Sequence, residues 1–264
     1  KAVRNAQELD RKNGNTFWMD ALSKEMGALV IAFEMLEHGH KAPVGWFKAT
    51  GHIVWDVKMD FTRKARWVKD GHKTPDSTTS SFAGVVSRES IRIGLTYAAL
   101  LGLSVIGGDI KNAYLQAPSS EKHFIVCGPE FGVENVGRVA LIRRAVSGKV
   151  AGRNFWHHLR ECVAHLGFTS SRADPDVWYR LSKRSTGEEY YEYVLLYVDD
   201  VLVISERAES VLRNEIGKNW VLKPESIGPP SQYLGGKLRE VTLANGVKAW
   251  AFGSHQYVQA AVKN

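Results

Sequence analysis

Two adjacent acids, Asp199 and Asp200, lie in the middle of an apolar stretch and constrain the fold of this chain more than any other feature. The flanking segments, 193–196 and 201–204, consist of Val, Leu, Ile and one Tyr, which is the composition of short buried strands. A bare carboxylate is costly in such surroundings unless it is paired or binds a metal. The simplest structure is a β-hairpin that turns near the aspartates and presents them at its tip.

A third acid, Asp109, follows the apolar segment 103–106 and the pair Gly107-Gly108. Together with Asp199 and Asp200 it can hold two Mg²⁺ ions, since Mg²⁺ takes one or two carboxylates plus phosphate oxygens. Two such ions, about 4 Å apart, activate an attacking hydroxyl and stabilise a leaving oxygen. The alternative is structural, because a single Asp at a strand end is commonly a cap or a turn residue.

The charge pattern is compatible with a polyanionic partner. The 264 residues carry a net charge of +7 at pH 7, and the pI is near 9.3. This charge does not by itself identify the partner. Residues 138–160, however, hold six basic side chains and no acid, and residues 41–73 are also rich in basic side chains. Such clustering favours a groove that follows phosphates over a uniformly basic surface.

Cysteine content and hydropathy exclude several classes of protein. The two cysteines, Cys127 and Cys162, form no CxxC pattern, which argues against a disulfide framework or a structural zinc site and favours a reducing compartment. The longest mostly apolar run, 94–108, is shorter than the roughly 20 residues of a membrane-spanning helix. No charged-then-apolar leader opens the sequence, so we expect no membrane association.

Periodicity predicts interleaved helices and strands. Helical spacing is found in residues 1–40, 91–103, 154–166 and 207–220. Strands are expected at 52–70, 105–110, 124–126 and 139–142, with one hairpin at 193–204 and a second formed by 233–236 and 249–252. Because the elements do not alternate as strict βαβ units, the predicted class is α+β, with one large core or two smaller lobes.

Several of these segments, in this order, resemble the reverse transcriptases of Ty1/copia retrotransposons. The strongest motifs are Gly-Asp-Ile-Lys-Asn-Ala-Tyr-Leu at 108–115 and Tyr-Val-Asp-Asp at 197–200. Weaker ones are the basic strand pair at 64–71 and the segments 81–92, 167–179 and 233–235. The similarity extends over about residues 16–262, and the ordered set is far more specific than the Tyr-Val-Asp-Asp tetrapeptide alone.

The resemblance implies a single reverse transcriptase domain with a right-hand polymerase fold, made of fingers and palm subdomains and at most the start of a thumb. The implied boundaries are fingers at about 16–104 and 123–155, palm at 105–122 and 156–245, and the start of the thumb or connection at 246–264.

The resemblance also implies a two-metal site. Asp109 and Asp199 would ligate both Mg²⁺ ions, with Mn²⁺ as a possible substitute, and Asp200 would add charge and orient ligands. Ile110 would offer its backbone carbonyl to a metal.

The nucleotide would be held by neighbouring residues. The amides of Lys111 and Asn112 would meet the triphosphate, and Lys64 and Arg66 would clamp it. Tyr114 would exclude a 2′-hydroxyl by a steric clash. Without the resemblance, the sequence is equally compatible with Tyr114 as an aromatic residue of the core. Lys64 and Arg66 are then expected on a solvent-exposed strand face.

The implied partners are a dNTP and an RNA or DNA template with its primer, which would pass near residues 233–236. The parent would be a Pol polyprotein with integrase and RNase H. It would be located in cytoplasmic virus-like particles, with possible nuclear entry.

Departures from the family motifs keep two other hypotheses open. Residues 145–150 differ from the family's LYGLKQ stretch, with Ser147 in place of an aromatic, and Gly84 replaces a customary Pro. These departures motivate a catalytically decayed palm fold that binds nucleic acid without extending a primer. The third hypothesis is a two-metal nuclease, which shares the carboxylates but needs no aromatic gate at Tyr114.

Overall fold

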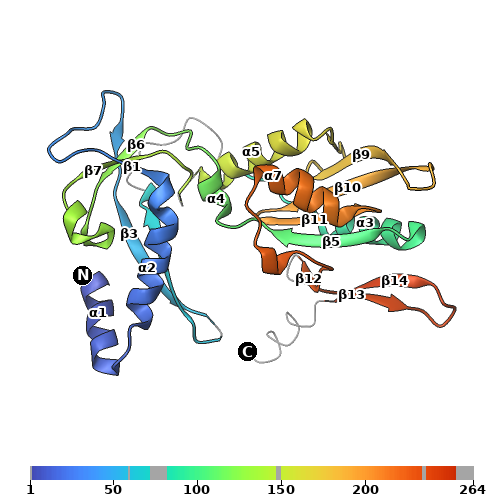
Figure 1. Ribbon diagram of the computed structural model, residues 1–264, viewed down its shortest axis with the longest axis horizontal. Coiled ribbons are helices and arrows are strands. Elements are labelled where there is room, and N and C mark those ends of the chain that lie inside the picture. The colour runs from blue at the N-terminus through green and yellow to red at the C-terminus, as the bar shows by residue number, and fades with distance from the viewer. Residues whose placement is uncertain (1, 59, 72–81, 147–149, 234–235, 254–264) are drawn as a thin grey trace. The chain divides into compact units, whose positions relative to one another are not determined.

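The computed structural model describes residues 2–58, 60–71, 82–146, 150–233 and 236–253. The chain forms two compact units (Figure 1). The first unit comprises Lys1–Phe82 and Asn112–Phe155, and the second comprises Ala83–Lys111 and Trp156–Asn264. No helix in the described part of the chain is long and apolar enough to span a membrane.

The first unit combines helices with a small mixed sheet and a hairpin. Its elements are α1 (Ala2–Asn13), α2 (Phe17–Leu29), η1 (Val30–Ala32), β1 (Phe33–Met35), β2 (Phe47–Lys48), β3 (Gly51–Val57), β4 (Arg63–Lys69), α4 (Ala113–Gln116), β6 (His123–Val126), η3 (Pro129–Phe131), η4 (Val133–Asn135) and β7 (Val139–Ile142). Four strands form a sheet in the order β1-β7-β6-β2, and β3 pairs with β4.

The β3–β4 hairpin illustrates why these residues form strands. Along β4, the buried side chains of Ala65 and Trp67 alternate with those of Lys64 and Arg66, so the two basic side chains share the opposite face. Helix α2 covers the buried face of β4, and Glu25 accepts a 3.0 Å hydrogen bond from the Trp67 amide.

The second unit is built around an antiparallel sheet. Its elements are α3 (Arg88–Leu101), β5 (Ser104–Asp109), β8 (Thr169–Ser170), β9 (Val177–Lys183), β10 (Glu189–Tyr197), β11 (Asp200–Ser205), α6 (Ala208–Ser210), the π-helix η5 (Val211–Ile216), α7 (Gly217–Asn219), η6 (Pro224–Ser226), β12 (Gln232–Tyr233), β13 (Gly236–Thr242) and β14 (Lys248–Gly253). Helix α5 (Ala151–His165) begins in the first unit and continues into the second.

Two sheets form in the second unit, with strand orders β5-β11-β10-β9-β8 and β12-β13-β14. Helix α3 and η5 both contact β5 and β11. Val105 packs with the α3 side chains, whereas Gly108 faces Leu212 of η5. Because residues three apart on a strand point to opposite faces, α3 and η5 cover opposite faces of the sheet. The predicted α+β class is therefore confirmed.

Helix α3 starts three residues before the predicted position because its N-terminus is capped. The Ser87 hydroxyl accepts a hydrogen bond from the Ser90 amide, and Gly102 ends the helix in the left-handed region at φ 62°. Asp174 fixes the same end, since its Oδ2 accepts bonds from the Ser87 amide and the Ser90 hydroxyl. These polar contacts extend the helix beyond the apolar pattern.

The expected pairing of residues 233–236 with 249–252 is wrong. Strand β14 pairs instead with β13, where Leu238 lies opposite Phe252, and Tyr233 pairs with Gly236. The error has a simple origin. β13 carries charged side chains at Lys237, Arg239 and Glu240, which hide the alternation around Leu238 in the sequence.

Candidate metal and catalytic site

The β10–β11 hairpin presents the adjacent aspartates as predicted. Tyr197 lies opposite Asp200, so Val198 and Asp199 form a two-residue turn. The residues of both strands next to the turn, 194–196 and 201–205, are buried in the sheet. Val198 has a φ of 51°, a value that a β-branched residue rarely adopts.

Asp109 joins these two acids through strand register. It lies directly opposite Asp200 across the β5–β11 pair, and the next amide, that of Ile110, donates a 2.8 Å hydrogen bond to the Asp199 carbonyl. Burial, followed by the charges of Asp199 and Asp109, raises the pKa of Asp200 to about 6. The sequence prediction that these three acids gather at one place is therefore consistent with the structure.

The two glycines before Asp109 allow close packing on both sides of β5. A Cβ atom on Gly108 would lie 2.9 Å from Leu212 Cδ2, so only glycine lets η5 approach this strand without a shift. Gly107 exchanges backbone hydrogen bonds of 2.8 and 3.2 Å with Gly228. Asp109 is thus anchored by neighbours on both sides.

Sequence reasoning missed Lys223, whose ammonium lies 2.6 Å from Asp109 Oδ2. The segment 221–228 brings it there by pairing with the outer edge of β5. The Lys223 amide donates to the Asp109 carbonyl at 2.9 Å, and the Asp109 amide donates to Ser226 Oγ at 2.8 Å. Lys223 is 114 residues from Asp109, and no periodicity in the sequence marks its segment as a partner of β5.

The Lys111 amide has a partner within the protein, and its contact with a triphosphate stays a prediction. The Lys111 amide, which we assigned to the triphosphate, donates a 2.8 Å hydrogen bond to the Val221 carbonyl. The same edge pairing that delivers Lys223 therefore uses this amide within the protein. Ile110 is fully buried, and the metal contact of its carbonyl stays a prediction.

The residues at this site fit a divalent cation. Asp109 Oδ1 is buried and has no hydrogen-bond partner among the described residues, and a bound cation or water can stabilise such an oxygen. Within the described residues, no group of three or more His, Cys, Asp or Glu side chains is placed so that it could hold a metal ion by itself. The binding of Mg²⁺ at this site stays a prediction.

A cavity of about 310 Å³ opens beside Asp109 and Asp200. Its walls come from Gly107 and Gly108, Val201 and the segment 225–233. A ligand in this cavity would reach two of the three carboxylates.

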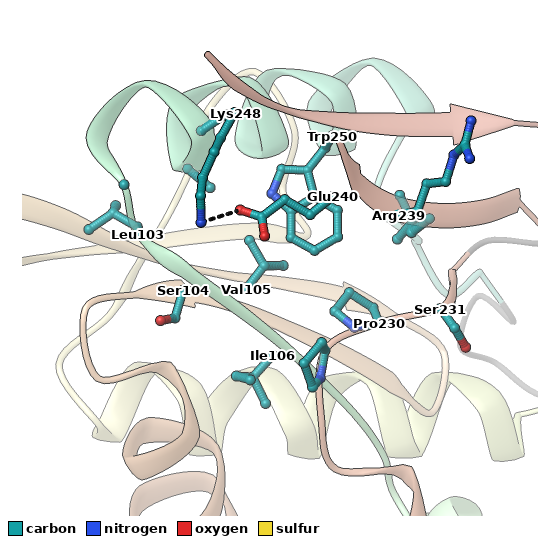
Figure 2. Close-up of a pocket in the computed structure, with 15 residues that line it drawn as sticks. Leu103, Ser104, Val105, Ile106, Pro230, Ser231, Arg239, Glu240, Lys248 and Trp250 are labelled. Atoms are coloured by element: carbon teal, nitrogen blue, oxygen red, sulfur yellow. Dashed lines mark ion pairs between the residues drawn. The ribbon is translucent and has the colours of Figure 1, made fainter. Parts of the chain in front are cut away.

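A second, larger cavity of about 500 Å³ lies between α3, β5 and the three-stranded sheet (Figure 2). Figure 2 shows Val105, Pro230 and Trp250 around it and the 3.4 Å ion pair between Lys248 and Glu240. None of the three aspartates lines this cavity, so we assign the chemistry to the smaller one.

Tyr233 couples the three-stranded sheet to the acidic hairpin. Its side chain is buried, and its hydroxyl donates a 3.1 Å hydrogen bond to the Leu195 carbonyl in β10. Its ring also packs edge-on against Tyr197. The Tyr233 side chain is therefore part of the packed interior of the second unit. The expected proximity of residues 233–236 to a primer stays a prediction, and 234–235 lie outside the described residues.

The remaining candidates belong to the first unit. Burial, with the nearby charges of Arg66 and Lys58, lowers the pKa of Lys64, as expected where cations gather. Asn112 adopts a left-handed conformation at φ 49° and precedes α4, which carries Tyr114. The Tyr114 ring lies 5.9 Å from that of Phe155. Their predicted roles with nucleotide stay predictions.

Comparison with known proteins identifies the family of this chain. A family model described as reverse transcriptase (RNA-dependent DNA polymerase) matches residues 41–264. The chain belongs to this reverse transcriptase family. Its acidic β5 and β10–β11 segments fall within the matched region.

The similar curated proteins are Pol polyproteins of plant Ty1/copia-type transposons. The reverse transcriptase chain is 29% identical over 189 residues to the retrovirus-related Pol polyprotein from transposon TNT 1-94 of Nicotiana tabacum, an alignment covering 69% of this chain and 13% of that polyprotein. It is 29% and 28% identical over 144 residues to those from transposons RE2 and RE1 of Arabidopsis thaliana, covering 53% of this chain and 10% of each. The chain thus corresponds to a small part of these relatives.

Proposed function

We propose that this chain is an RNA-directed DNA polymerase that transfers a deoxynucleotide from a dNTP to a primer 3′-hydroxyl. The observation that carries the proposal is the register of β5 with β11, which sets Asp109 opposite Asp200 and beside the Asp199 turn. The unpartnered, buried Asp109 Oδ1 supports a cation at this place.

In the proposed reaction, Asp109 and Asp199 hold two Mg²⁺ or Mn²⁺ ions. When bound, these ions activate the attacking hydroxyl and neutralise charge on the leaving pyrophosphate. The protein contributes position. The β5–β11 register fixes Asp109, the two-residue turn fixes Asp199, and Asp200 adds negative charge and orients ligands.

By the same resemblance, we propose the fingers and palm of a right-hand polymerase, with fingers at about 16–104 and 123–155, palm at 105–122 and 156–245, and the start of the thumb or connection at 246–264. The compact units divide at other places, after Phe82, Lys111 and Phe155. Lys64, Arg66 and Asn112 are proposed to bind the triphosphate, and Tyr114 to reject ribonucleotides.

The relatives' names support a larger context for the chain. We propose a parent Pol polyprotein that also carries integrase and RNase H. Its proposed location is a cytoplasmic particle from which nuclear entry follows.

The test is Mg²⁺-dependent primer extension on poly-rA/oligo-dT, with dTTP and UTP compared. Asp199→Asn should lower the extension rate by at least about 10²–10³-fold, the usual effect of removing one electrostatic group from an active site. Its circular dichroism and Tm should match those of the wild type. Asp20→Asn, an exposed substitution of the same kind in α2, is the matched control and should extend normally.

Other outcomes would support the alternatives. Binding of template-primer without any extension by the wild type would indicate the decayed relic. The stretch that motivates that hypothesis falls largely at 147–149, outside the described residues. Cleavage of nucleic acid without a dNTP requirement would indicate a nuclease, and normal extension by Asp199→Asn would exclude the proposed site.

A further inference from the structure

The ion pair between Lys223 and Asp109 links two features of the site. Lys223 Nζ lies 2.6 Å from Asp109 Oδ2, while the other oxygen of the same carboxylate, Oδ1, is buried and has no hydrogen-bond partner in the part of the chain that the structure describes. One oxygen is thus paired with a cation of the protein, and the other is left for a cation from outside. A lysine ammonium and a divalent ion compete for the same carboxylate charge.

Lys223 is held in place by the backbone around it. Its amide donates to the Asp109 carbonyl, and its carbonyl accepts a 2.7 Å hydrogen bond from the Ser226 hydroxyl. Ser226 Oγ in turn accepts the Asp109 amide. Lys223 and Asp109 are joined by a backbone hydrogen bond as well as by the ion pair of their side chains. The backbone contact therefore keeps the ammonium close to this carboxylate.

The location of Lys223 also balances charge. The strand register places Asp109 opposite Asp200 and beside the Asp199 turn, and the ammonium lies against Asp109, whose side chain is 24% exposed. The side chain of Lys223 is 37% exposed and has a flexible stem, so it can swing into solvent without disturbing the backbone pairing.

We propose that Lys223 is a metal-exchangeable counter-ion of Asp109, which occupies the carboxylate when no divalent ion is bound and leaves it when the ion enters. The inference rests on the proposed metal site and adds a residue that sets the affinity of that site. Lys223 is here a positioning residue, because it acts through Asp109. It stabilises the metal-free cluster and thereby weakens metal binding.

The first test measures Mn²⁺ binding to the full chain by isothermal titration calorimetry, without nucleotide or primer. Lys223→Met, which keeps the length and removes the charge, should bind Mn²⁺ roughly tenfold more tightly, the effect of losing one competing charge-assisted hydrogen bond. Its metal-free Tm should fall, and the rise in Tm on adding Mn²⁺ should exceed that of the wild type. Lys223→Arg should stay within about threefold of the wild type, because the competing charge is retained.

Two controls separate this effect from general electrostatics. Lys218→Met removes an equal charge from an exposed position five residues away and should leave Mn²⁺ affinity within about twofold, since exposed charges are screened. In an Asp109→Asn background, Lys223→Met should no longer tighten Mn²⁺ binding. Equal Mn²⁺ affinities for the wild type and Lys223→Met would overturn the inference.

A second measurement needs no variant and therefore does not depend on how Lys223→Met folds. Acetylation of the wild-type chain by acetic anhydride, followed by peptide mass spectrometry, reports how free each lysine amine is. Saturating Mn²⁺ should increase the labelling of Lys223 at least about threefold while leaving Lys218 unchanged, because an amine released from a carboxylate is the more reactive one. Unchanged Lys223 labelling would contradict the exchange.

The two proposals fail in different ways. A wild-type chain that neither binds Mn²⁺ nor extends a primer would refute the proposed function. A chain that binds Mn²⁺ and extends a primer, but whose affinity and Lys223 labelling do not respond as described, would refute only the role of Lys223.

Discussion

Asp200 shows at the scale of one residue what it costs to gather three acids. Burial is the largest effect, and the charges of Asp199 and Asp109 add to it, so the pKa of Asp200 rises from 3.8 to about 6 against the opposing effect of Lys223. Active sites commonly hold groups whose pKa is displaced in this way. The same displacement makes Asp200 a source of instability at neutral pH.

The sign of that effect gives a prediction. A carboxyl whose pKa is higher in the folded than in the unfolded state makes its full contribution to stability below the unfolded value, near 3.8, and loses it as the pH rises to about 6. Asp200→Asn removes this loss. In EDTA at pH 7.5 its Tm should exceed the wild-type Tm by about 2–4 °C, as expected for ~1 kcal/mol.

The check is a series of Tm values in EDTA from pH 4.5 to 8. The difference between Asp200→Asn and the wild type should grow between pH 4.5 and about 6 and then level off. Glu161→Gln, an exposed change on α5, serves as the charge-matched control. A constant difference across the series would show that the substitution acts by another route.

At the scale of elements, the acidic hairpin carries strain in its turn. Val198 adopts a φ of 51°, where a β-branched side chain is disfavoured by about 1–3 kcal/mol. Glycine removes that strain and costs about 0.5–1 kcal/mol in chain entropy. Val198→Gly should therefore raise the Tm slightly, by roughly 2–3 °C for ~1 kcal/mol of net gain.

The measurement is thermal unfolding of Val198→Gly beside a matched exposed control. Val136 has an ordinary φ of −55°. Val136→Gly therefore increases the conformational entropy of the unfolded chain without relieving strain, and it should lower the Tm. Equal losses for the two variants would show that the Val198 conformation stores no strain.

The elements also show what could be read from sequence. The β10–β11 hairpin was predictable because two apolar runs flank the adjacent acids, so that the chain has to turn near them. Strand β5 was predictable because its apolar segment is followed directly by a glycine pair and an acid. The segment 221–228 was not, since it pairs through backbone groups and one lysine, without an apolar period of its own.

Gly84 is a similar case, because its meaning depends on a residue far along the chain. A side chain on Gly84 would collide with the Asp176 carboxylate, which accepts a 2.8 Å hydrogen bond from Trp156 Nε1 and pairs with Arg160. The departure from the customary Pro is therefore part of a local polar arrangement. The sequence showed the substitution but not the partner that requires it.

At the scale of the whole molecule, two clusters of buried apolar side chains among the described residues lie in different compact units. One surrounds Trp67 and Ile125 in the first unit, and the other surrounds Leu195 and Leu202 in the second. Cores that share no side chains give local unfolding a natural boundary. The sequence allowed either one core or two, because periodicity reports which face of an element is buried and not which elements bury it together.

The two cysteines lie in different compact units and can report on these units separately. Cys127 is buried in the first, where burial and Glu130 raise its pKa to about 11, so it reacts only after unfolding. Cys162 lies on α5 in the second unit, and burial raises its pKa as well. Both thiols are thus slow to alkylate in the folded chain.

Core substitutions should therefore move the two thiols independently in urea. Ile125→Ala, at about 2–5 kcal/mol for a buried aliphatic truncation, should lower the urea midpoint for alkylation of Cys127 by roughly 1–2 M and leave that of Cys162 in place. Leu202→Ala should do the reverse, and Val44→Ala, which is fully exposed, should move neither. Peptide mass spectrometry after pulse alkylation gives both midpoints in one sample. If each core variant shifts both midpoints equally, the two units unfold as one cooperative structure.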